Sequence, residues 1–157
     1  MARLTQISNS PKTPNLPFGV FAMLEFSVTK KDFVVWRKEK SELHNVKIRP
    51  GFYEREVWFC VVGENIGYEQ DGRGPRFLRP VVVIKKFNNE VLWVLPLTTK
   101  EKTGKYYYSF KLGEKAVSTA ILSQLKLIDA KRLEYKIGNL TKNDFKSLKL
   151  KLTQLLA

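Results

Sequence analysis

Residues 80–97 read PVVVIKKFNNEVLWVLPL, in which two runs of β-branched, aliphatic and aromatic residues flank a pair of asparagines. Runs of this composition are typical of β-strands, and Asn tolerates the positive φ angles of a two-residue hairpin turn. We therefore predict strands over residues 80–87 and 91–97, joined by Asn88 and Asn89 into a β-hairpin.

Segments on both sides of this hairpin have a similar composition. Residues 54–62 precede it, and residues 106–112 and 116–127 follow it, with a turn at residues 113–115 between the last two. Residues 132–137 add a short edge strand. Five or six short strands with tight turns predict a mainly β protein, built as a small curled sheet or barrel with flanking helices.

Helical spacing is present at both ends of this β region. The first helix is predicted over residues 30–44, after a capping-box-like sequence at residues 29–32. Its stripe of large apolar residues consists of Phe33, Trp36 and Leu43. The second helix begins after Thr141 and continues to about Leu156. Its apolar stripe consists of Phe145, Leu148, Leu152 and Leu155.

These patterns divide the chain into three parts. Residues 1–28 are rich in Pro, Ser, Asn and Thr and are predicted to be an irregular N-terminal tail. Residues 29–45 form an amphipathic helical extension, and residues 46–157 form one β domain with a C-terminal helix. The three tryptophans are assigned to the core, and at least one ring of residues 106–108 is expected outside it.

The composition limits the classes of function. A net charge of +13 points to a polyanionic partner, nucleic acid first, with a solubilising surface as the alternative. The single Cys60 excludes a disulfide framework and a cysteine zinc site, and the single His44 excludes a two-histidine ribonuclease mechanism. We expect no metal or other cofactor. The apolar run at residues 17–24 is far shorter than the roughly 18 residues of a membrane span, so we expect a cytoplasmic protein without membrane contact.

The segment between the first two predicted strands carries the functional signal. Residues 63–80 read GENIGYEQDGRGPRFLRP, with four glycines and three arginines in a stretch too long for a simple turn. Glycines let the backbone approach a phosphate closely, and an arginine fork matches phosphate oxygens. A flexible hairpin with scattered charges is the alternative interpretation.

Taken together, these segments resemble the MazF/PemK-like toxins of bacterial type II toxin–antitoxin systems. The family has a G-E-[IV]-W strand followed by G-x-E-Q-x-G-x-R-P-V, a V-x-P-[LC]-T run and a D-Q-[IV]-[RK]-x-[IV]-D-x-x-R-L segment. The matching segments here are E-V-W at 56–58, G-Y-E-Q-D-G at 67–72, R-P-V-V-V at 79–83, V-L-P-L-T at 94–98 and S-Q-L-K-L-I-D-A-K-R-L at 123–133. The resemblance covers about residues 51–157.

The resemblance implies an SH3-like β-barrel, a homodimer, and metal-independent cleavage of single-stranded RNA by attack of the neighbouring 2′-OH. It also implies a cognate acidic antitoxin as partner. The catalytic pair of one branch of the family falls on Arg79 and Thr98. The candidate RNA-binding residues are Glu69, Gln70, Gly72, Arg73, Arg76 and Gln124.

Two departures from the family pattern affect this assignment. Residues 74–78 are inserted before Arg79. The aspartate that is catalytic in another branch is replaced by Ser123, and the arginine and histidine of that branch fall on Ile121 and Tyr68. Arg79 and Thr98 therefore form the only complete catalytic set.

Physical chemistry suggests a role for each candidate. A guanidinium is a poor base near neutral pH, but it stabilises the charge that develops on a phosphorane, so Arg79 is assigned that role. The hydroxyl of Thr98 is a hydrogen-bond donor to a non-bridging oxygen. Glu69 is either a general base or a loop fastener that pairs with Arg73 or Arg79, and the sequence leaves both open.

Two other functions share this fold. A CcdB-like toxin binds DNA gyrase without enzymatic activity, and a degenerate barrel binds RNA without cutting it. Arg79 and Thr98 favour an endoribonuclease over a gyrase-binding toxin, whereas the insertion and Ser123 favour binding alone.

Overall fold

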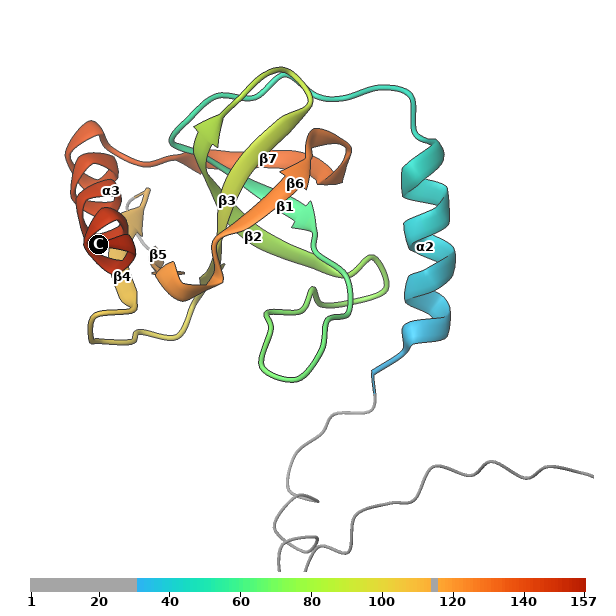
Figure 1. Ribbon diagram of the computed structural model, residues 1–157, viewed down its shortest axis with the longest axis horizontal. Helices are drawn as coiled ribbons and strands as arrows, with labels where there is room; N and C mark the ends of the chain where they lie inside the picture. The colour runs from blue at the N-terminus through green and yellow to red at the C-terminus, as the bar shows by residue number, and fades with distance from the viewer. Residues whose placement is uncertain (1–30, 114–115) are drawn as a thin grey trace, which may run out of the picture. The chain divides into compact units, whose positions relative to one another are not determined.

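A computed structural model describes residues 31–113 and 116–157 of the chain (Figure 1). Residues Asp32 to Ala157 make up one compact unit. Its strands are β1 (Glu56–Val61), β2 (Leu78–Lys86), β3 (Val91–Thr98), β4 (Tyr107–Leu112), β5 (Ala116–Ile121), β6 (Lys126–Asp129) and β7 (Leu133–Asn139). They pair antiparallel in the order β4-β5-β3-β2-β1-β7, with β6 beside β3, which confirms the predicted mainly β fold.

The predicted hairpin is present, but its turn differs from the prediction. The connection between β2 and β3 covers residues 87–90, and neither asparagine has a positive φ. The side chain of Asn88 instead accepts hydrogen bonds from the backbone N–H groups of Glu90 and Val91, both at 2.8 Å. An Asn side chain that mimics a backbone turn in this way removes the need for a left-handed conformation.

The run at residues 116–127 is two strands rather than one. A short 3₁₀ turn at Leu122–Gln124 separates β5 from β6, because the two strands pair with different halves of β3. The β6 pairing ends at Val94 and the β5 pairing begins at Leu97. Pro96 lies between these two pairings, where no ladder partner on that side needs its missing N–H group.

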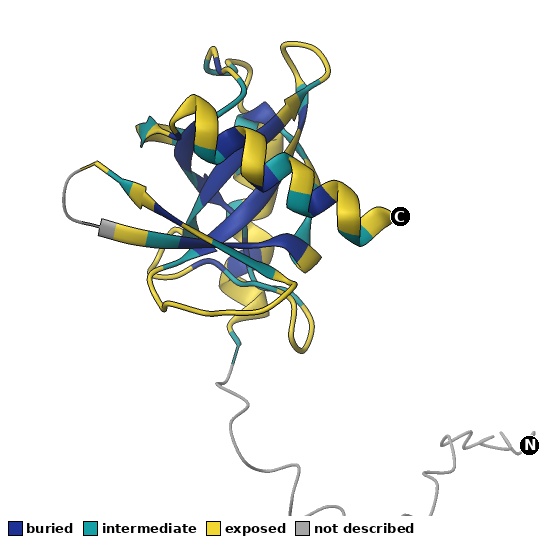
Figure 2. Cartoon of the chain, turned by 90° about the vertical axis from the view of Figure 1, so that its left-hand side faces the viewer, coloured by how far each residue is buried: buried dark blue, intermediate teal, exposed yellow. Residues whose placement is uncertain are grey.

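Each face of the sheet is covered by its own hydrophobic cluster. Helix α3 (Lys142–Leu156) lies across one face, and its buried side faces the strands in Figure 2. Phe145, Leu148 and Leu152 pack there with residues of β1, β2 and β3. The side chain of Thr141 accepts a hydrogen bond from the Asp144 N–H and caps the helix, as predicted. The opposite face buries Phe52, Trp58, Cys60, Val81, Val83, Leu92, Val94, Ala130 and Leu133.

Helix α2 (Phe33–Asn45) is shorter at its start than the sequence predicted. Asp32 is the N-cap and accepts a hydrogen bond from the Val35 N–H, whereas Thr29 lies outside the described residues. Of the predicted apolar stripe, Trp36 is buried, Leu43 is half-buried and Phe33 is 49% exposed. Trp36 packs with Val61 and Phe77 in a third, smaller cluster.

The aromatic predictions are correct in part. Trp36 and Trp58 are buried, but Trp93 is 38% exposed and packs edge-on against Phe87 at the surface. Tyr106 lies outside the core, as expected for one of the three tyrosines. His44 lies exposed in the last turn of α2.

Within the described ranges, 31–113 and 116–157, no helix is both long and apolar enough to cross a membrane.

Candidate functional site

The ends of β2 and β3 bring Arg79 and Thr98 together. The β2–β3 ladder ends at the pair Val81–Pro96, two residues from Arg79 and Thr98, and the Arg79 guanidinium donates to the carbonyl of Leu97, the neighbour of Thr98, at 3.1 Å. Side chains two residues apart lie on one face of a strand, so both residues follow the face of Val81 and Val94. The two predicted catalytic residues thus lie near each other at adjoining ends of β2 and β3, where both line one pocket.

Two backbone carbonyls fix the plane of the Arg79 guanidinium. Its Nε donates a short hydrogen bond to the carbonyl of Asp71, and one terminal nitrogen donates to the carbonyl of Leu97 at 3.1 Å. The group has five N–H donors, so three others are available to a ligand. Burial and the nearby charge of Arg73 lower its pKa, while Asp71 opposes the shift. A guanidinium nevertheless stays protonated near neutral pH.

Arg79 and Thr98 line a small pocket of about 110 Å³. Its lining includes three cationic side chains, those of Arg73, Arg79 and Lys100, and no carboxylate. The Thr98 Oγ1 accepts a hydrogen bond from the Lys100 N–H at 3.2 Å, which leaves its own O–H as a donor. A pocket with this lining favours an anion that accepts several hydrogen bonds.

The inserted segment forms a tight turn that returns the chain to the strand. Arg73, which precedes the insertion, and Leu78, its last residue, exchange two backbone hydrogen bonds at 2.8 and 2.9 Å. Phe77 has a φ of 51°, a left-handed conformation that is rare outside glycine and is held here by burial of its ring. Because the insertion closes on itself, Arg79 enters β2 in a regular register.

Gly72 lies at the neck of the long loop, defined here as the place where backbone hydrogen bonds join residues 62–63 to residues 72–77. Its N–H donates to the Gly63 carbonyl at 2.8 Å, and a Cβ at this position would lie 1.7 Å from the Phe77 carbonyl oxygen. The Phe77 oxygen also accepts from the N–H groups of Val62 and Gly63. Gly72 is buried, so the structure gives it a role in backbone packing, and its predicted RNA contact stays a prediction.

Gln124 ties the tip of the loop to the sheet. Its Oε1 accepts from the Gln70 N–H at 3.3 Å, and its Nε2 donates to the Tyr68 carbonyl at 3.4 Å. Glu69 lies between these two anchor points and is exposed. Among the described residues, Glu69 forms no ion pair with Arg73 or Arg79.

Arg76 points to a different set of partners from the other two loop arginines. It forms ion pairs with Glu134 of β7 at 2.8 Å and with Glu39 of α2 at 3.6 Å. The turn of the insertion is therefore fastened to α2 and to the sheet. An RNA contact of Arg76 stays a prediction, and it has to compete with two carboxylates.

Lys126 of β6 is a candidate that the sequence reasoning did not single out. It lines a second pocket of about 110 Å³ with Asn65, Cys60 and Arg132. Burial lowers its pKa, with further lowering by Arg132 and Arg79, whereas Glu69 and Asp71 act in the opposite direction. The sequence pattern could have identified Lys126, because it occupies the basic [RK] position of the family pattern within a predicted strand.

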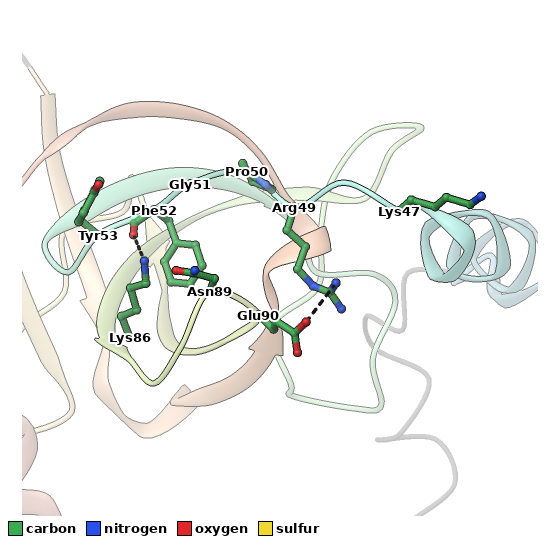
Figure 3. Close-up of a pocket in the computed structure, with 9 residues that line it drawn as sticks. All are labelled: Lys47, Arg49, Pro50, Gly51, Phe52, Tyr53, Lys86, Asn89 and Glu90. Atoms are coloured by element: carbon green, nitrogen blue, oxygen red, sulfur yellow. Dashed lines mark hydrogen bonds and ion pairs between the residues drawn. The ribbon is translucent and has the colours of Figure 1, made fainter.

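A larger pocket lies away from these residues, between the chain that precedes β1 and the β2–β3 hairpin (Figure 3). Its charged side chains hold that segment against the sheet. The Lys86 ammonium donates to the Phe52 carbonyl at 3.2 Å, and Arg49 forms an ion pair with Glu90 at 3.7 Å. None of the predicted site residues lines it. Throughout residues 31–113 and 116–157, no group of three or more His, Cys, Asp or Glu side chains is arranged to hold a metal ion.

The chain belongs to the family of PemK-like, MazF-like toxins of type II toxin–antitoxin systems, whose match covers residues 53–156. The resemblance found in the sequence motifs is thereby confirmed. The matched range begins after α2, so this helix lies outside the family match. No curated protein matches the sequence.

Solved structures share the fold at low sequence identity. A Mycobacterium tuberculosis toxin, MazF-mt6, has a TM-score of 0.50 and 15% identity over 65% of this chain and 96% of its own. An endoribonuclease from a mycobacterial species, solved in complex with its cognate antitoxin, has a TM-score of 0.52 and 13% identity over 68% of this chain and 95% of its own. At these identities the similarity establishes a MazF-like fold.

Proposed function

We propose that this toxin is an endoribonuclease that cuts single-stranded RNA at the pocket of Arg79 and Thr98. The observation that carries the proposal is that Arg79 and Thr98 line one pocket, with three cations and no carboxylate in its lining. Family membership and the similarity in fold to a mycobacterial endoribonuclease support it.

In the proposed reaction the 2′-oxygen of a ribose attacks the adjacent phosphorus atom and the 5′-oxygen leaves. The products are a 2′,3′-cyclic phosphate and a 5′-OH end. Arg79 donates N–H groups to the charge that develops on the non-bridging oxygens, and Thr98 adds a hydroxyl donor. Because the carbonyls of Asp71 and Leu97 fix Arg79 before substrate binds, its donors need little reorganisation.

The proton of the 2′-OH needs an acceptor, and the leaving 5′-oxygen gains a proton. Glu69 is the candidate acceptor on the loop, although it does not line the pocket of Arg79. The alternative is that its charge only balances Lys126, since Glu69 raises the pKa of that lysine. Glu69→Gln distinguishes the two roles, because loss of a general base removes the acidic limb of the pH profile of kcat, whereas loss of a charge partner of Lys126 leaves that limb in place.

The experiment uses a library of single-stranded RNA in the presence of EDTA. Removal of one preorganised donor lowers the rate about 10²–10³-fold, so Arg79→Ala is expected to lose at least this factor. Arg79→Lys restores little, since Lys lacks the planar fork. Arg37→Ala, which removes an exposed arginine of α2, is the matched control and keeps the wild-type rate.

Three outcomes contradict the mechanism. Undiminished cutting of RNA with a 2′-deoxy nucleotide at the cut site excludes 2′-OH attack. Complete loss of activity in EDTA excludes metal independence. RNA binding without any cleavage by the wild type favours the non-enzymatic alternative.

We also propose that the toxin acts as a homodimer and is inhibited by an acidic antitoxin segment. The net charge of +13 and the cationic pocket suit an acidic segment that covers Arg73 and Arg79. The mycobacterial endoribonuclease solved in complex with its cognate antitoxin supports an antitoxin as partner. Sedimentation that shows only an 18 kDa species at micromolar concentration contradicts the dimer, and a complex that leaves both arginines exposed contradicts the inhibitory contact.

A further inference from the structure

Helix α2 and the sheet enclose a second cationic site. A pocket of about 280 Å³, called here the basic pocket, lies between α2 and the 3₁₀ turn at Ala130–Arg132. Its charged and polar lining consists of Lys40, His44, Arg49, Asp129, Lys131 and Arg132. The lining thus carries four permanent positive charges against one carboxylate.

Several contacts hold the basic pocket in shape. The Arg49 guanidinium makes a two-pronged bond to Asp129, at 2.8 and 2.9 Å, and also contacts Glu90, so the nearby carboxylates are occupied. The Lys131 ammonium donates to the His44 carbonyl at 2.7 Å and ties the turn to α2. Arg132 donates to the Val61 carbonyl at 2.9 Å. These bonds keep the cationic groups in place without a ligand.

Trp36 anchors α2 on the sheet beside this pocket. Its ring stacks edge-on with Phe77 and lies under the Arg132 guanidinium. The ring also occupies the space next to Gly63, where a Cβ would lie 2.2 Å from it. The helix is therefore seated on the neck of the long loop, and Lys40 projects from a fixed element.

A row of cations connects the basic pocket to Arg79. Arg132 lines both the basic pocket and the neighbouring pocket of Lys126. Lys126 in turn interacts electrostatically with both Arg132 and Arg79. A nucleic-acid strand carries one negative charge per nucleotide along its backbone, so one strand can meet every member of such a row. The regular charge of the backbone, one phosphate at every nucleotide, matches a row of cations, and on this ground we favour RNA as the occupant.

We propose that the basic pocket binds a backbone phosphate of the same RNA strand that is cut at Arg79. The inference rests on the proposed function, and it gives α2 a role in RNA binding. Phosphate contacts carry no sequence information, so this contact adds affinity and register rather than base selectivity.

The test measures RNA binding without cleavage. The probe is a fluorescent, random-sequence RNA with 2′-O-methyl groups, in a long form and in a short form that spans only the cut site. The variant Lys40→Gln/Lys131→Gln is compared with Lys142→Gln/Lys146→Gln, which removes two exposed charges of α3. Binding is followed by anisotropy over a salt titration.

Loss of the contact to one phosphate reduces the slope of log K against log salt by about 0.7, which corresponds to about fivefold weaker binding at 0.1 M salt if the electrostatic part vanishes at 1 M. We expect this loss for the long RNA, no loss for the short RNA, and a much smaller loss for the α3 variant. Lys40→Gln alone, at an exposed helix position, removes about half of the slope change and avoids any effect on the Lys131–His44 bond.

The outcomes separate the two proposals. Equal losses in the two double variants show a general effect of net charge and overturn the inference. Unchanged RNA binding, with weaker binding of a poly-glutamate peptide, assigns the pocket to an acidic protein segment instead. A wild type that binds the long RNA without cutting cleavable RNA refutes the proposed function and leaves the binding test valid.

Discussion

The burial of Trp36, the only buried residue of the described helix α2 (Phe33–Asn45), leads to a quantitative prediction for Trp36→Ala. Trp36 is 8% exposed, and a buried tryptophan removes about 200 Å² from water, which is worth up to about 5 kcal/mol at 25 cal/mol per Å². Truncations of buried Trp or Phe to Ala cost about 3–5 kcal/mol. We therefore expect a loss of about 4 kcal/mol in the free energy that holds α2 against the sheet.

Helix α2 has 13 residues, and isolated helices of about this length are marginal in water. Loss of the anchor should therefore release and unfold α2 while the sheet stays folded. Hydrogen exchange is the assay: amides of α2 should lose protection, and so should Val62 and Gly63, whose N–H groups bond to the Phe77 carbonyl. Val34→Ala on the same helix is the control, because Val34 is 82% exposed and its truncation costs less than about 0.5 kcal/mol.

Unchanged exchange of α2 in Trp36→Ala refutes this reasoning. That result would mean that the ion pair of Arg76 with Glu39 and the bond of Lys131 to His44 hold the helix without the ring. Trp36→Phe provides a graded test, since a smaller ring keeps part of the contact with Phe77.

Two further predictions concern the loop neck and the response to acid. Gly72→Ala should disrupt the loop, because the added Cβ would lie 1.7 Å from the Phe77 carbonyl oxygen. We expect RNA cleavage to fall at least as far as in Arg79→Ala, and the melting temperature measures folding separately. Full activity of this variant contradicts the packing role of Gly72. Burial alone raises the pKa of Glu56, but the ion pair with Lys136 and the hydrogen bonds from Tyr53 and Trp58 outweigh it and lower the pKa below its ordinary value. The stability from this lowered pKa is present above about pH 4.5 and is lost as the pH falls through the folded-state pKa. Glu56→Gln should therefore lower the free energy of unfolding by about 2 kcal/mol at pH 7. The free energy of unfolding, measured by urea denaturation, should also fall less steeply in acid than that of the wild type. An unchanged pH dependence contradicts a lowered pKa of Glu56.

The sequence predicted the strands well because their local composition is decisive. All six expected strand segments overlap an observed strand, and the family resemblance assigned a catalytic pair to Arg79 and Thr98, which line one pocket in the structure. The error at residues 116–127 arose because the break between β5 and β6 depends on a change of partner along β3. That change is a tertiary property, and the apolar pattern runs through it without interruption.

The environment of the site was harder to predict, because it depends on contacts between residues distant in sequence. The tether from Gln124 to Gln70 spans 54 residues, and the ion pair of Arg76 with Glu134 spans 58. An arginine in a glycine-rich loop looks the same in the sequence whether it faces a ligand or a pair of glutamates. The contact of Trp36 with Gly63 could not be predicted either, because a glycine in a sequence does not indicate which side chain occupies the space beside it.

The burial of Cys60 has a practical consequence for following the loop in solution. Cys60 is the only cysteine of the chain, it is fully buried, and burial raises the pKa of its thiol to about 12. A thiol in this state reacts slowly with maleimides, since the thiolate is the reactive form. Tyr68 is 98% exposed at the tip of the long loop, so Tyr68→Cys places one reactive thiol there in an otherwise native sequence. A dye attached at this position can report on the loop as RNA or an antitoxin binds, with no need to replace the native cysteine first.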